Sequence, residues 1–177
     1  TFFKHPLALW VSMNPATAIA FIFSGTSFLL LNTRIYSKTK HILASALAGC
    51  VCFIGILKIL ESITHIELGL DNLLYSIIAP DSAMPVINSM STTAAACFIM
   101  IGFSLFLLNM DVFPTPTLAH LLAFITALIS LFAVLCIFFT AKGQESIAPL
   151  STNTSLCFLF ISISILFINA DIGLFKE

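Results

Sequence analysis

Two charged side chains, Lys58 and Glu61, lie within an otherwise apolar stretch of the chain. Their i, i+3 spacing allows them to form an ion pair on one face of a helix. A charge inside a membrane costs roughly 2.5 to 3.5 kcal/mol on insertion scales, so such residues are candidates for ligand binding or proton sensing. The competing interpretation is a purely structural pair, in which the lysine reaches toward the membrane surface.

His65 and Asp71 follow this pair and extend the candidate site. His65 lies one helical turn beyond Glu61, and histidine titrates near neutral pH, which suits pH sensing. A histidine that is simply solvated at the membrane surface is the alternative. We therefore predict a ligand-binding site formed by Lys58, Glu61, His65 and Asp71.

The sequence contains no pattern that is typical of a catalytic centre. It has no Gly-rich phosphate loop, no HExxH pattern and no nucleophile accompanied by a base and an orienting group. His41 and His120 begin two apolar stretches and could pair on a haem, but they adjoin Lys40 or a Pro-rich loop, which is typical of interface residues. We predict no catalytic residue, no metal and no cofactor. The five cysteines are expected to serve packing: Cys50, Cys52, Cys97, Cys136 and Cys157.

The elements that carry these residues are long and apolar. The chain is 59% hydrophobic and 8% charged, whereas a soluble domain typically has about 25% charged residues. A membrane-spanning helix needs roughly 20 mostly apolar residues, and a membrane β-strand would instead alternate polar and apolar residues. Five continuously apolar segments meet the helix requirement: 15–32, 41–63, 92–110, 118–140 and 152–170.

We therefore predict a single all-α domain over residues 1–177, a polytopic transmembrane bundle of about five spans. Apolar residues at helical spacing in 66–78 predict a short interfacial helix on the outer surface. Positive residues favour the cytoplasmic side, which places segment 34–40 and Lys176 inside, against Lys4 and Lys142 outside. The net charge of −1 provides no basic stripe for nucleic acid.

Three stretches of this chain align without gaps, at 13–32, 90–109 and 150–169. Asn14, Ser91 and Ser151 are good N-cap residues, so each stretch is predicted to open a helix at the outer side. Small residues in the shared columns would let neighbouring helices approach closely in lipid. Asn at the inner end could cap the helix or bond its last exposed carbonyls. The shared columns are Phe21, Phe98 and Phe158; Gly25, Gly102 and Ser162; Ser27, Ser104 and Ser164; and Asn32, Asn109 and Asn169.

The segments between these stretches begin alike, with His41-Ile-Leu-Ala and His120-Leu-Leu-Ala. The repeating unit is therefore a hairpin of one outgoing and one returning helix. The first returning helix, predicted at 15–32, lacks an outgoing partner in this sequence. We expect one more span upstream, which would give three hairpins around a pseudo-threefold axis.

The segment LKILESITHIELGLDNLLY, followed by MSTTAAACFIMIGFSLFLLN, resembles the N-terminal membrane sensor region of bacterial histidine kinases and diguanylate cyclases. The resemblance extends over residues 7–174. It aligns Glu61 with an acidic residue of the family's first motif, whereas Thr92 and Thr152 replace the proline of the family's repeat. It implies a bacterial inner-membrane location, a cytoplasmic C-terminus, a homodimer and an output domain in the same polypeptide.

These observations predict a sensory input domain that couples a signal to a cytoplasmic kinase or cyclase domain. A small transporter or channel is the main alternative, because internal repeats are common in transporters. A structural subunit of a membrane complex is the third. The membrane domain itself is not expected to be an enzyme.

Overall fold

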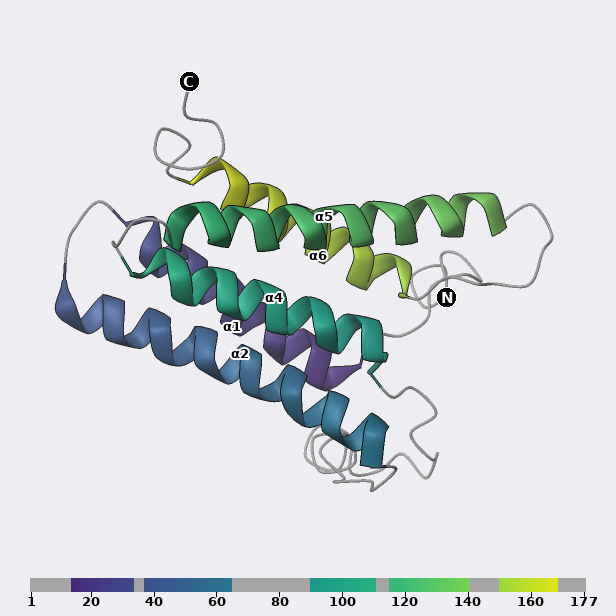
Figure 1. Ribbon diagram of the computed structural model, residues 1–177, viewed down its shortest axis with the longest axis horizontal. Coiled ribbons are helices and arrows are strands. Elements are labelled where there is room, and N and C mark those ends of the chain that lie inside the picture. Colours follow the sequence, from purple (N-terminus) through teal and green to yellow (C-terminus); the bar gives the residue numbers. More distant parts are fainter. Residues whose placement is uncertain (1–13, 34–36, 65–89, 111–114, 141–149, 169–177) are drawn as a thin grey trace, which may run out of the picture.

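The computed structural model describes residues 14–33, 37–64, 90–110, 115–140 and 150–168. This part of the chain is all-α, as predicted, and contains no strand. The predicted interfacial helix at 66–78 lies outside the described residues. The helices are α1 (Pro15–Leu31), α2 (Lys38–Thr64), α4 (Thr92–Leu108), α5 (Thr115–Thr140) and α6 (Thr152–Phe167) (Figure 1).

Polar caps begin the three helices of the aligned stretches, as predicted. The Asn14 side chain accepts a hydrogen bond from the backbone N–H of Ala16 at 2.8 Å. Ser91 and Ser151 cap α4 and α6 in the same way, through the third backbone N–H that follows. Each cap satisfies one of the amide groups that a helix start leaves without an intrahelical partner.

The five described helices form two groups. Helices α1, α4 and α6 contact one another in the middle of the bundle and are called the inner helices here. Helix α2 packs against α1 and α4, and α5 packs against α4 and α6, so α2 and α5 are called the outer helices (Figure 1). Each outer helix thus packs against the two inner helices that flank it in the sequence.

Small side chains make the close contacts between helices. A Cβ atom added to Gly102 would lie 2.6 Å from Cys52 Sγ and 2.9 Å from the Ala48 carbonyl oxygen. At Gly55 an added Cβ would lie 2.7 Å from the carbonyl oxygen of Ala95. The backbones of α2 and α4 therefore approach more closely than any larger residue at these positions would permit.

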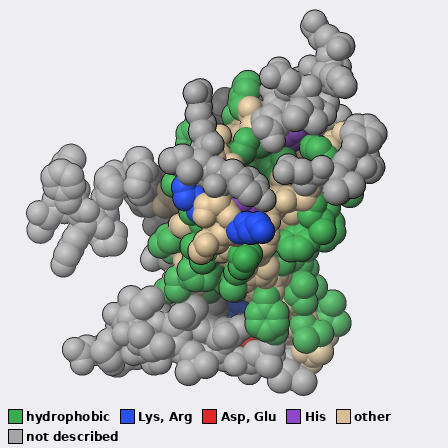
Figure 2. All heavy atoms as spheres, turned by 90° about the vertical axis from the view of Figure 1, so that its left-hand side faces the viewer, with side chains coloured by type: hydrophobic (Ala, Val, Ile, Leu, Met, Phe, Trp, Pro, Cys, Tyr) green, Lys and Arg blue, Asp and Glu red, His purple; other side chains and the backbone are tan. Residues whose placement is uncertain are grey.

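The interior is rich in small and hydroxyl-bearing residues, and many bulky apolar side chains point outward. Buried residues include Ala20, Ala44, Ala48, Ala95, Ala119, Ala123, Ser24, Ser27, Ser104, Thr126, Ser130 and Ser162. Exposed side chains include Ile22, Leu29, Ile42, Phe53, Ile63, Phe132, Phe160 and Phe167. Figure 2 views the end of the bundle where α2 and α5 begin, with lysine or arginine and histidine side chains at that end and hydrophobic side chains on its flanks.

Two described helices are long and apolar enough to cross a membrane, by length and composition alone. They are Lys38–Thr64 and Pro116–Ile137, with mean hydropathies of 2.3 and 2.5. The inner helices are apolar too, but α1 and α4 have 17 residues each and α6 has 16. At a rise of about 1.5 Å per residue they are about 25 Å long, against a hydrocarbon core of about 30 Å.

Candidate functional site

Lys58 and Glu61 lie near the C-terminal end of α2 and contact each other, as their spacing predicts. Lys58 Nζ donates a hydrogen bond to Glu61 Oε2 at 2.6 Å, and the two side chains are only 7% and 16% exposed. The same end of α2 is linked to the start of α4, because Ser62 Oγ lies 3.4 Å from Thr92 Oγ1. The ion pair is therefore placed at the junction between these two helices.

The chemistry of this pair depends on its burial. A charge-assisted hydrogen bond between ammonium and carboxylate is stronger than a neutral one. Burial costs each ion its hydration, and the attraction of its partner offsets that cost. Any event that protonates the carboxylate or offers either ion a new partner would disturb the α2–α4 junction. Of the four residues predicted for this site, His65 and Asp71 lie outside the described residues.

A second polar group lies at the other end of α2. Asn109 closes α4, and its side-chain Oδ1 lies 2.5 Å from His41 Nδ1. The amide nitrogen of Asn109 donates to the His41 carbonyl oxygen at 3.1 Å and also to Ser45 Oγ. We call His41, Ser45 and Asn109 the amide clamp, since it joins the start of α2 to the end of α4.

A comparable bond joins α5 to α6. His120 is fully buried, and its Nε2 donates to the carbonyl oxygen of Ile168 at 3.0 Å. Both histidines thus connect the start of an outer helix to the end of the inner helix that follows it. Within the described residues no group of three or more histidine, cysteine, aspartate or glutamate side chains is placed to hold a metal ion.

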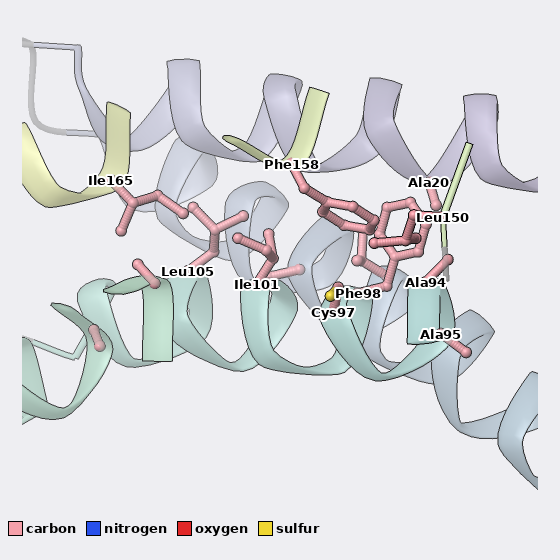
Figure 3. Packing of buried hydrophobic residues seen from close by; sticks show 14 of the residues in the cluster. Ala20, Ala94, Ala95, Cys97, Phe98, Ile101, Leu105, Leu150, Phe158 and Ile165 are labelled. Carbon is pink, nitrogen blue, oxygen red and sulfur yellow. The ribbon is translucent and has the colours of Figure 1, made fainter. Parts of the chain in front are cut away.

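The residues of the shared columns lie in different parts of the bundle, depending on the column. Phe21, Phe98 and Phe158 meet in the middle of the inner helices, with ring centroids 4.8, 4.6 and 4.6 Å apart. We call them the phenylalanine cluster. Figure 3 shows Phe98 and Phe158 facing each other from α4 and α6, followed along the core by Ile101, Leu105 and Ile165.

The serine column points away from the centre. Ser27 Oγ donates to the Ala44 carbonyl oxygen on α2 at 2.9 Å, and Ser104 Oγ donates to the Ala119 carbonyl oxygen on α5 at 2.8 Å. Ser164 instead donates to the Phe160 carbonyl oxygen of its own helix at 2.8 Å. Two of the three aligned serines therefore connect an inner helix to the outer helix that follows it.

The asparagine column caps two of the inner helices, as predicted. Asn32 and Asn109 are the C-cap residues of α1 and α4, and their backbone N–H groups bond the last carbonyl oxygens of these helices. The side chain of Asn109 in addition reaches α2. Ile168 caps α6, and Asn169 lies outside the described residues.

The amide clamp and the His120 bond were not predicted from the sequence as contacts. The available signal was the shared His-x-x-Ala start at residues 41 and 120, together with the asparagine column. Comparison of the chain with protein-family models, with curated proteins and with solved structures gave no match.

Proposed function

We propose that the chain is a polytopic membrane domain in which all five described helices cross the bilayer. The distribution of side-chain size supports this proposal. Soluble monomers rarely expose extended apolar patches, whereas helices that associate in lipid bring small residues together and leave bulky apolar ones toward the acyl chains. The buried alanine, glycine and serine residues and the exposed leucine, isoleucine and phenylalanine residues follow the second pattern.

Within that setting, we propose that the domain is the sensory input part of a bacterial signalling protein in the cytoplasmic membrane. The observation that carries the proposal is the Lys58–Glu61 pair, in which Lys58 is buried and Glu61 half-buried. The pair lies near one end of α2, and the other end of this helix is bonded to α4 through the amide clamp. An ion pair of this kind is costly to keep in an apolar environment and marks a functional position by default. The resemblance to the membrane regions of histidine kinases and diguanylate cyclases supports the same role.

The proposed mechanism is a shift between two packings of the helices. A stimulus at the outer end would bind one arrangement of the Lys58–Glu61 junction better than another and so change its population. A change in α2–α4 packing would reach the inner end at the amide clamp, and α5 would transmit it through the His120 bond to the end of α6. The chain after α6 would carry the displacement to a cytoplasmic kinase or cyclase domain, in a homodimer.

The test measures output from the full-length protein in liposomes, with the cytoplasmic domain that its own reading frame encodes. Autophosphorylation or cyclic dinucleotide synthesis is compared for the wild type, for Glu61→Gln and for Thr64→Ala. Thr64→Ala is the matched control, because the Thr64 hydroxyl donates to the Leu60 carbonyl oxygen of its own helix. We expect Glu61→Gln to change output about 5-fold or more, the lower end of typical coupling between sites, while the control stays at wild-type output.

Output of Glu61→Gln equal to that of the wild type at every pH between about 5 and 8, roughly the interval in which histidine titrates, would remove this site from the proposal. A reading frame without any output domain would remove the sensory role. Solute or ion flux through the purified protein would favour the transporter alternative instead. The phenylalanine cluster argues against a pore along the axis of the inner helices, because three rings fill the centre.

A further inference from the structure

The inner helices are short between their polar ends. Helix α1 runs from the Asn14 cap to the Asn32 cap and α4 from the Ser91 cap to the Asn109 cap, with 17 helical residues each. Helix α6 has 16 residues after the Ser151 cap. At a rise of about 1.5 Å per residue, each inner helix is about 25 Å long. In a hydrocarbon core of about 30 Å, these helices fall short by about 5 Å.

The outer helices α2 and α5 have length to spare. They contain 27 and 26 residues, which is about 40 Å of helix. Helix α2 meets α4 at two levels, where His41 lies beside Asn109 and where Ser62 lies 3.4 Å from Thr92. Residues 41–62 of α2 thus run alongside residues 92–109 of α4 (Figure 1), and the α2 segment is longer by about 6 Å. Helix α2 is therefore inclined to α4, and a more upright α2 would reach about 6 Å farther.

The Lys58–Glu61 pair lies at the outer limit of the inner helices. Gly55 and Ser62, which flank the pair on α2, both contact the first turn of α4. A hydrocarbon layer that matches the inner helices in length leaves the pair at the polar interface. A layer of about 30 Å extends past the ends of these helices and draws the pair below the interface, where a charge is costly.

The burial of the pair favours a stimulus that acts without contact. Lys58 and Glu61 are only 7% and 16% exposed, so a dissolved ligand would have to separate α2 from α4 before it reached either charge. The thickness of the lipid layer acts on the depth of the whole bundle instead. The surrounding lipid therefore reaches the pair through the position of α2.

We propose that the stimulus read at the Lys58–Glu61 pair is the thickness of the hydrocarbon layer, and thus the length of the lipid acyl chains. A thin layer matches the inner helices and favours the described packing, in which α2 is inclined. A thick layer favours a more upright α2, because its outer end then carries the pair back toward the polar interface. The reserve of about 6 Å in α2 covers the shortfall of about 5 Å in the inner helices. This inference rests on the proposed sensory role and names its stimulus.

The first test measures output from the full-length protein in liposomes of phosphatidylcholine. Monounsaturated chains of about 14, 18 or 22 carbons vary the thickness of the layer. We expect wild-type output to differ by about 5-fold or more between the shortest and the longest chains. Thr64→Ala should keep this dependence. The double variant Lys58→Met, Glu61→Leu should lose most of it, because an apolar pair has no cost in hydrocarbon.

Two results of this test would overturn the proposal. One is equal wild-type output in all three lipids, and the other is a double variant that keeps the full dependence on chain length. The sensory role would survive either result if Glu61→Gln still changed output in a single lipid. The two proposals therefore fail separately.

The second test needs no output domain. Pairs of nitroxide labels, on cysteines in a background without the native ones, report helix distances in the same three lipids. One pair is placed at Ile63 and Thr92 for the outer ends of α2 and α4, and the other at Ile42 and Met110 for the inner ends; all four positions are exposed. We expect the outer distance to increase with chain length and the inner one to change less, because the amide clamp holds the inner ends. An outer distance that is constant, or that changes no more than the inner one, would refute the thickness response.

Discussion

Two groups of residues in this bundle act in different ways: the phenylalanine cluster through packing, and the Lys58–Glu61 pair through charge. The phenylalanine cluster fills the space between the inner helices, and Phe98 and Phe158 are fully buried. The Lys58–Glu61 ion pair lies at the junction of α2 and α4. The two features respond differently to substitution, because lost packing leaves a cavity whereas a lost partner leaves a buried charge.

Phe158→Ala tests the cluster. Truncating a buried phenylalanine costs about 3 kcal/mol or more in soluble proteins through lost contacts and the remaining cavity, and the cavity part also applies in lipid. We expect a clear fall in the free energy of unfolding, measured by SDS titration of the detergent-solubilised protein. Phe132→Ala on the exposed face of α5 should leave it within about 0.5 kcal/mol of the wild type. Equal losses for both variants would show that the cluster has no special role in stability.

Substitution at Lys58 and Glu61 separates a structural pair from two independent charges. Removing one partner of a buried pair costs about 3 kcal/mol because an unpaired charge remains, whereas replacing both by apolar residues is often neutral. We expect Lys58→Met and Glu61→Leu each to destabilise the protein and the double variant to recover most of the loss. Additive losses in that double-mutant cycle would refute the coupling. Output measured on a stable double variant then isolates the signalling role of the pair.

The helices of this bundle associate through close approach of their backbones rather than through the packing of large apolar side chains. The contact of α2 with α4 depends on Gly55 and Gly102, where a methyl group would collide with the facing helix. Hydrogen bonds from Ser27 and Ser104 to carbonyl oxygens of the outer helices add polar links inside an apolar environment. Double-mutant cycles give such interhelical bonds in membranes about 0.6 kcal/mol each, so the packing carries most of the association.

Gly102→Ala should therefore weaken the α2–α4 contact, although alanine is the better helix former. Overpacking of this kind costs typically about 1 to 3 kcal/mol, and the added Cβ would lie within 2.6 Å of Cys52 Sγ. Gly49→Ala, with nothing within 4 Å, should be neutral or stabilising by up to about 1 kcal/mol. Thermal unfolding of both variants in one detergent measures the difference. A Gly102→Ala protein as stable as Gly49→Ala would mean that the helices separate freely.

The whole molecule is arranged so that the amide clamp and the His120 bond lie at the ends where α4 and α6 finish. Those ends, together with the starts of α2 and α5, face one side of the proposed membrane. Lys38 and Lys40 lie at the start of α2, and the charge bias of membrane proteins predicts the cytoplasmic side for them. Signals would therefore arrive at the Lys58–Glu61 end and leave at the end where α6 finishes.

Orientation can be measured directly. Single cysteines at Arg34 and Lys176, in a background with the five native cysteines replaced, should react with a membrane-impermeant maleimide only from the cytoplasmic side. Cysteines at Lys4 and Lys142 should react only from the outside. The reason is that an odd number of crossings separates each of the first two positions from each of the last two. Labelling of positions 34 and 176 from opposite sides would refute the five-span arrangement.

The sequence alone determined the local features. The helix starts depend on capping residues, which are Asn14, Ser91 and Ser151. The ion pair depends on the i, i+3 spacing of Lys58 and Glu61. The shared phenylalanine column is visible from the alignment of three short stretches of the chain. Helical geometry sets these relations within one helix, and no distant partner is needed to specify them.

Only the tertiary structure decided which face of each helix is covered. The helices are apolar all round, so periodicity assigns no buried side, and the same column holds a closely packed Gly102 and an open Gly25. The bond between His41 and Asn109 joins residues 68 positions apart. Such choices depend on the three-dimensional packing of one helix against another, where the small residues of one face must meet a backbone that is distant in the sequence.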